Sequence, residues 1–90
     1  MGYSLFDSNG YIGDVGTTGG LQDLRKYCLS MKKHNVRLFL DKGAALITEV
    51  FMNEVKALRP RKKTIQTTAE NLLVLLERCE GVAIISDGVN

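Results

Sequence analysis

The sequence has no tryptophan, one proline, one histidine and two cysteines in 90 residues. Cys28 and Cys79 stand far apart and form no CxxC pair, and a single histidine cannot complete a common zinc pattern. The one histidine, His34, stands beside two lysines at the charged end of a predicted helix, and the cysteines lie on apolar helix faces, where a thiolate is disfavoured. We therefore predict that the protein is not an enzyme and has no catalytic residue, no cofactor and no metal.

Long apolar runs are also absent. The longest, residues 72–76, has five residues, whereas a membrane-spanning helix needs about 20. The first ten residues, MGYSLFDSNG, have neither the positive start nor the apolar centre of a secretory signal. These features predict a cytoplasmic location and no membrane association.

Glycine is concentrated near the start, because residues 6–20 contain five of the nine glycines. The dipeptide Asn9-Gly10 between two β-prone runs favours a tight hairpin turn. Residues 16–20, GTTGG, match neither a P-loop nor a dinucleotide-binding pattern, although a glycine-rich turn before a helix can bind phosphate. The preferred interpretation is a compact turn from strand to helix, with anion binding as the alternative.

Three aspartates, Asp7, Asp14 and Asp87, stand at or just after predicted strand ends. Carboxylates gathered at one edge of a sheet could hold Mg²⁺ or Ca²⁺. However, antiparallel strands end at opposite edges, and Asp-Gly and Asp-x-x-Gly are common turn sequences. A structural role in turns is therefore preferred to a metal site.

Apolar spacing predicts a single α+β domain over residues 1–90. A three-stranded sheet, made of an N-terminal hairpin and a C-terminal strand, should pack against about three helices. The predicted strands are residues 3–6, 11–15 and 82–85, and the predicted helices are residues 21–31, 44–58 and 65–79. Residues 36–40 are apolar except for Arg37, in a pattern that fits a strand or a helix.

Helix ends and core positions follow from the same spacing. Thr18 is the predicted N-cap of the first helix, and Asn35 is its predicted end. For the third helix, Thr67 with Glu70 has the spacing of a capping box, and Thr64 is the alternative cap for an earlier start. Glu54 is the one polar residue on the apolar side of the second helix. The residues expected to dominate the core are Leu46, Ile47, Val50, Phe51, Leu72, Leu73, Leu76 and Ile84, so Leu73→Ala should lower the melting temperature sharply.

The only charge run is Arg59-Pro60-Arg61-Lys62-Lys63. Its four cations are candidate contacts for phosphate or nucleic acid, although no aromatic residue is interleaved for base stacking. The net charge is only +2, so a nucleic-acid hypothesis depends on this local cluster. A solvated connection between helices is the more common role for such a run.

Three tyrosines, Tyr3, Tyr11 and Tyr27, are candidates for a protein interface, because tyrosine offers rigid contact area. Core and rim positions are the ordinary alternative. With no catalytic pattern, the preferred hypothesis is a non-enzymatic binding or structural module that binds a protein partner or self-associates. The alternative hypothesis is a nucleic-acid-binding accessory protein that uses residues 59–63.

Two segments, SLFDSNGYIGDV and TAENLLVLLERCEGVAIISDG, resemble the two ends of small uncharacterised proteins encoded by bacteriophages and prophages. The resemblance covers about a third of the chain and involves structural residues. It implies a phage-linked origin and a phage or bacterial host protein as partner. It implies no catalytic residues.

Overall fold

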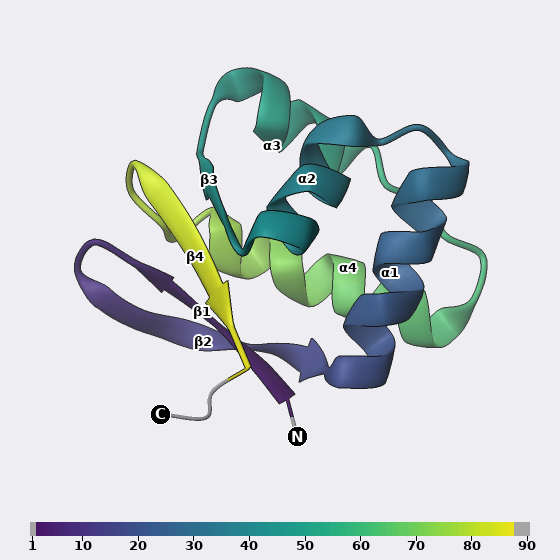
Figure 1. Ribbon diagram of the computed structural model, residues 1–90, viewed down its shortest axis with the longest axis horizontal. Coiled ribbons are helices and arrows are strands. Elements are labelled where there is room, and N and C mark those ends of the chain that lie inside the picture. The colour runs from purple at the N-terminus through teal and green to yellow at the C-terminus, as the bar shows by residue number, and fades with distance from the viewer. Residues whose placement is uncertain (1, 88–90) are drawn as a thin grey trace.

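The computed structural model describes residues 2–87, which form four strands and four helices (Figure 1). In chain order these are β1 (Gly2–Asp7), β2 (Gly10–Thr17), α1 (Thr18–Ser30), α2 (His34–Lys42), β3 (Ala44–Leu46), α3 (Glu49–Lys56), α4 (Lys63–Leu76) and β4 (Val82–Ser86). The strands form one sheet in the order β2-β1-β4-β3, and all neighbours are antiparallel. The predicted α+β class and the three predicted strands are confirmed, with one strand and one helix more than expected.

The N-terminal hairpin forms as its turn sequence predicts. The backbone N–H of Asn9 donates to the Asp7 carboxylate over 2.8 Å, and Gly10 has a φ of 117°, which a residue with a Cβ rarely adopts. The register pairs Phe6 with Tyr11 and Leu5 with Gly13, so Ile12 is an extra residue in β2. A second irregularity leaves Val15 extra, and its side chain is fully buried.

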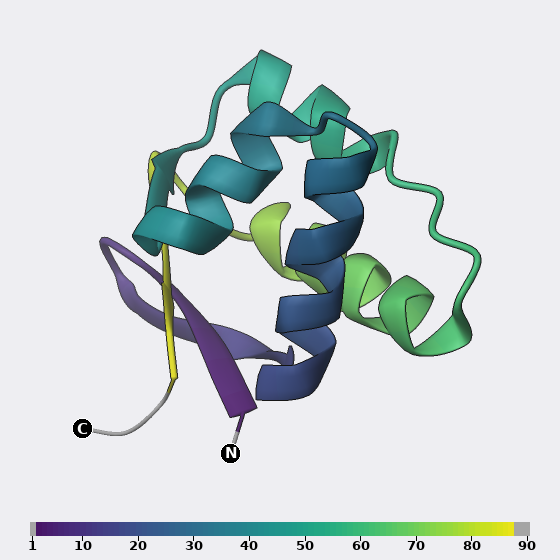
Figure 2. The ribbon, with the colours of Figure 1, turned by 45° about the vertical axis from the view of Figure 1, so that its right-hand side comes forward.

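The helices lie on one face of the sheet, and no helix of residues 2–87 covers the other face (Figures 1 and 2). The core fills the space between the two layers. From the sheet it takes Leu5, Val15, Ala83 and Ile85, and from the helices residues such as Leu24, Phe39, Leu72 and Leu76. We call the face toward the helices the inner face and the opposite face the outer face.

The predicted helix over residues 44–58 is wrong in its first part. Gly43 ends α2 with a φ of 81°, and the next three residues pair with β4 as β3. The Thr48 side chain then accepts a hydrogen bond from the Phe51 N–H and starts α3. Apolar spacing alone could not separate a three-residue strand from the first turn of the helix after it, because both place apolar residues at close intervals.

The ambiguous residues 36–40 belong to α2, and Glu54 explains how that helix starts. No side chain of α2's own N-terminus caps it. Instead, Glu54 of α3 accepts hydrogen bonds from the Val36 N–H at 2.8 Å and from the Asn35 side chain at 3.0 Å. The single polar residue on the apolar side of α3 is therefore a cap supplied by a neighbouring helix.

Several predicted helix ends are shifted. Thr17, one residue before the predicted Thr18, caps α1 by accepting the Gly20 N–H. The capping-box prediction for Thr67 and Glu70 is wrong, since α4 begins at Lys63 and both residues lie inside it.

Asn35 does not end α1 but lies in α2. Helix α1 ends at Ser30. After it, Lys32 has a φ of 58° and the Lys33 N–H donates to the Cys28 carbonyl at 2.8 Å. This is a Schellman-type ending that uses lysine where glycine is usual.

The predicted core is right in part. Phe51, Leu72 and Leu76 are buried, and Ile47 and Leu73 are half-buried. The prediction is wrong for Leu46, Val50 and Ile84, which are 67%, 66% and 42% exposed. Leu46 and Ile84 lie on the outer face of the sheet, and Val50 lies in the first turn of α3. Leu72→Ala should accordingly cost more stability than Leu73→Ala.

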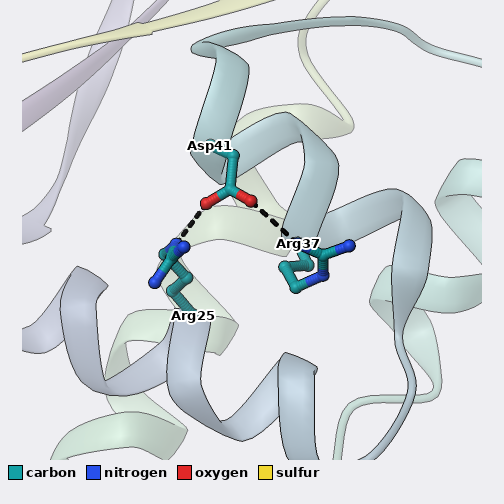
Figure 3. Close-up of polar contacts among 3 residues, drawn as sticks. All are labelled: Arg25, Arg37 and Asp41. Carbon is teal, nitrogen blue, oxygen red and sulfur yellow. Dashed lines mark hydrogen bonds and ion pairs between the residues drawn. The ribbon is translucent and has the colours of Figure 1, made fainter.

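An ion-pair cluster ties α1 to α2 (Figure 3). Asp41 accepts from the Arg25 side chain of α1 and from Arg37, one turn earlier in α2, over 3.0 Å. The hydrogen bond from Arg25 holds the pKa of Asp41 below its usual range, and the charges of both arginines add to this effect. Exposed pairs of this kind typically contribute about 1 kcal/mol or less to stability.

Candidate functional site

The glycine-rich segment is explained by close packing. A Cβ on Gly20 would stand 2.8 Å from the Thr68 hydroxyl of α4, and one on Gly13 would stand 2.6 Å from a methyl of Leu75. The Asn71 side chain of the same helix donates to the Val15 carbonyl at the irregular part of β2. Glycine therefore lets α4 lie directly against β2 and the first turn of α1.

The aspartates do not gather at one place. Asp7 is buried, and its carboxylate accepts the N–H groups of Asn9 and Glu80, which joins the hairpin to the α4–β4 connection. Asp14 lies on the outer face, where it accepts the hydroxyls of Ser4 and Tyr11, each at 2.9 Å. Among residues 2–87, no group of three or more His, Cys, Asp or Glu side chains could hold a metal ion.

Both cysteines are in surroundings that keep the thiol protonated. Burial raises the pKa of Cys28 to about 12, and the nearby Glu54 carboxylate adds to the increase. Burial, followed by the charge of Asp7, also raises the pKa of Cys79. Because the thiolate is the nucleophilic form, neither position favours cysteine chemistry at neutral pH.

The three tyrosines lie in separate surroundings. Tyr3 packs against the core and borders a small hollow with Leu21 and Ile85. Tyr11 is 59% exposed on the outer face, and its hydroxyl donates to Asp14. Tyr27, on α1, accepts the backbone N–H of Arg59 at 2.9 Å. The proposed tyrosine interface is therefore not one continuous surface.

The basic run lies in the connection between α3 and α4 and ends at Lys63, the first residue of α4; its cations have different roles. The Arg59 guanidinium donates to the carbonyls of Lys56 and Leu58, so it caps the end of α3. Arg61, Lys62 and Lys63 are exposed. Gln66 holds the connection over α4 by donating to the Pro60 carbonyl at 2.9 Å. Arg59 is thus partly a structural residue, which its position in a charge run did not indicate.

A groove of about 540 Å³ lies between this connection, α3 and α4. Its apolar side is formed by the buried residues Val55, Leu58, Pro60 and Ala69, together with the half-buried Leu73. Its polar lining consists of Lys56, Arg59, Arg61, Gln66 and Glu70. The groove therefore combines an apolar floor with three cations and one carboxylate.

The cations beside this groove form no ion pair within residues 2–87. The ion pairs of the described chain are both made by Asp41, in the cluster between α1 and α2. Lys56 and Arg61 have no carboxylate within ion-pair distance in that part of the chain. An acidic group entering the groove would therefore meet available positive charge.

Comparisons with protein-family models, curated proteins and solved structures found no match. No helix among residues 2–87 has the length and apolar character needed to span a membrane.

The sequence had indicated the cations of residues 59–63 but not the apolar floor of the groove beside them. That floor comes from α3 and α4, which are brought together only by the fold.

Proposed function

We propose that the protein is a non-enzymatic protein-binding module whose α3–α4 groove receives an acidic segment of a partner protein. The observation that supports this proposal is the apolar floor of the groove beneath cations that have no carboxylate partner in residues 2–87. A segment with an apolar side chain flanked by Asp or Glu matches both features, because the side chain covers the floor and the carboxylates meet Lys56 and Arg61.

The shape of the groove favours a peptide over a nucleic acid. Its volume of about 540 Å³ lies within the usual range of ligand pockets and can hold one or two aliphatic side chains. No aromatic residue lines it, so it lacks the aromatic surface on which successive bases usually stack. A hydrophobic anchor in a pocket is the usual centre of a peptide interface.

The alternative proposal is nucleic-acid binding through Arg61, Lys62 and Lys63, which are exposed at consecutive positions. Such binding would weaken steeply with salt: the slope of log K against log salt concentration would be about −0.9 per phosphate contact.

The resemblance of the chain's ends to phage-encoded proteins leads us to seek the protein partner among phage or bacterial host proteins of the cytoplasm.

The test is an NMR titration of the ¹⁵N-labelled protein with a short peptide of alternating glutamate and leucine. We expect shift changes at Leu73, Ala69 and Arg61. A peptide with lysine in place of glutamate should produce none of these changes. Arg61→Glu should weaken binding at least about tenfold, since it replaces attraction with repulsion. Arg78→Glu, which makes the same charge change beyond the other end of α4, is the matched control.

Duplex and single-stranded oligonucleotides are titrated in parallel. Tight, salt-sensitive oligonucleotide binding that is lost in the variant Arg61→Ala/Lys62→Ala/Lys63→Ala would favour the alternative. Arg59 is left intact because its guanidinium caps α3. Failure of the acidic peptide to shift any residue of the groove, at concentrations where the oligonucleotides also fail, would contradict both proposals.

A further inference from the structure

The outer face of the sheet carries a row of apolar side chains across all four strands. The register places Tyr11 opposite Phe6, Phe6 opposite Ile84, and Ile84 opposite Ala44. Residues directly opposite each other in antiparallel strands point to the same face, so these four side chains form one row. Val82 and Leu46, which are also paired, lengthen the apolar surface on the side of β3 and β4.

This surface is exposed although it is apolar. Leu46 is 67% exposed and Ile84 is 42% exposed, and the helices of the chain all lie on the other side of the sheet (Figure 2). The rings of Phe6 and Tyr11 pack edge to face with their centres 5.7 Å apart, which gives the row a rigid aromatic end. A contiguous apolar surface of this kind usually marks an interaction site, unlike single scattered residues.

We propose that a second copy of this chain packs against the outer face, sheet against sheet. Charge is the first reason. Asp14 is the one charged side chain in the cross-strand rows of this face, and its carboxylate is already held by Ser4 and Tyr11. Each copy carries a net charge of +2, so two copies meet with least repulsion through this apolar row, which has no charged side chain. An acidic partner would find no countercharge here, and a basic partner would find only Asp14.

Size is the second reason, and it also sets the strength of the contact. The four strands have six, eight, three and five residues, so a spacing of about 4.8 Å between strands and a rise of about 3.3 Å per residue give a face of roughly 350 Å². Two such faces in contact bury on the order of 1,000 Å², once the relief of the side chains is included, which is the lower limit for a specific interface. The structure therefore fits a weak, reversible dimer in which the same face contacts itself about a two-fold axis.

The dimer would leave the α3–α4 groove open, because that groove belongs to the helical layer and the contact belongs to the opposite side of the sheet (Figures 1 and 2). The inference does not depend on the groove's proposed function. If both hold, the dimer presents two grooves, and a partner with two acidic segments would bind more tightly than its single segments do.

The test compares two exposed apolar residues of nearly equal exposure. Leu46 lies on the outer face, and Val50, at 66% exposed, lies on α3. Sedimentation equilibrium of the wild-type chain, from about 10 µM to about 1 mM, should show a mass that rises from monomer toward dimer. Leu46→Glu should weaken dimerisation at least about tenfold, because it buries two unpaired carboxylates in the contact. Val50→Glu should leave dimerisation unchanged.

Ile84→Lys provides a second substitution in the centre of the face and should have the same effect as Leu46→Glu. Circular dichroism confirms that each variant is folded, which the exposure of both sites leads us to expect. A wild-type chain that stays monomeric up to about 1 mM would overturn the proposal. So would a dimer that survives both outer-face variants, or one that Val50→Glu weakens as much as Leu46→Glu.

Discussion

Ile84 and Ile85 are neighbours in β4 with the same side chain, yet they lie in opposite environments. Ile85 is 9% exposed and packs against the helices, whereas Ile84 is 42% exposed on the outer face. The two faces of β4 from Val82 to Ile85 are thus both apolar in sequence, but only one is covered by the described chain. The comparison shows that apolar composition marks where contacts can form, while the fold determines which of them are made within the chain.

The largest expected effect comes from truncating each isoleucine in turn. Ile85→Ala should destabilise the protein by about 2–4 kcal/mol, because it leaves a cavity in the core. Ile84→Ala should cost less than about 1 kcal/mol, since nearly half of the residue is already exposed to water. Urea unfolding, measured at a concentration where the chain is monomeric, gives both values. Equal losses for the two variants would show that the outer face is covered in the monomer.

The sequence predicted this fold well where its signals were local. The dipeptide Asn9-Gly10 predicted the hairpin, and the β-branched run before Ser86 predicted β4. The errors lie where the deciding contact is distant in sequence. The strand β3 forms because β4 offers it a free edge, and α2 is capped by Glu54 of α3, 18 positions after Val36. Neither partner can be identified from spacing alone.

The candidate site was predictable in charge but not in shape. Residues 59–63 stood out as the only charge run, and Arg61, Lys62 and Lys63 are exposed as a solvated connection should be. Arg59 caps α3 because of the way the chain turns after Leu58. The connection lies beside an apolar floor because of the way α3 and α4 cross. Charge composition contains no information about either arrangement.

The next expected effect uses a carboxylate on each face. Asp7→Ala should cost about 2–3 kcal/mol, because Asp7 is buried and its loss leaves the N–H groups of Asn9 and Glu80 without an acceptor. Asp14→Ala removes only exposed hydrogen bonds from Ser4 and Tyr11 and should change stability by less than about 1 kcal/mol. Thermal unfolding of both variants makes the comparison.

Asp7→Asn is the control for this pair, since its amide oxygen can still accept one of the two N–H groups. Its stability should fall between those of the wild type and Asp7→Ala. If Asp7→Ala proved as stable as Asp14→Ala, the link between the hairpin and the α4–β4 connection would contribute nothing to folding.

The smallest expected effect extends the contrast between covered and open positions to two adjacent glycines of α1. Gly19 has open space where a Cβ would stand, so Gly19→Ala should stabilise the helix by up to about 1 kcal/mol. Gly20→Ala should instead destabilise by about 1 kcal/mol, because its methyl group would meet the hydroxyls of Thr68 and Thr17 at 2.8 and 3.2 Å.

Thr68→Ala makes this prediction sharper, because it removes the closer of the two hydroxyls. In the double variant Gly20→Ala/Thr68→Ala, the added methyl group fills the space that the hydroxyl leaves. The two substitutions should therefore be less destabilising together than the sum of their separate costs, by about 0.5–1 kcal/mol. Urea unfolding of the four proteins of this cycle measures the coupling. Additive costs, or a Gly20→Ala variant as stable as Gly19→Ala, would mean that Thr68 does not set how closely α4 approaches α1.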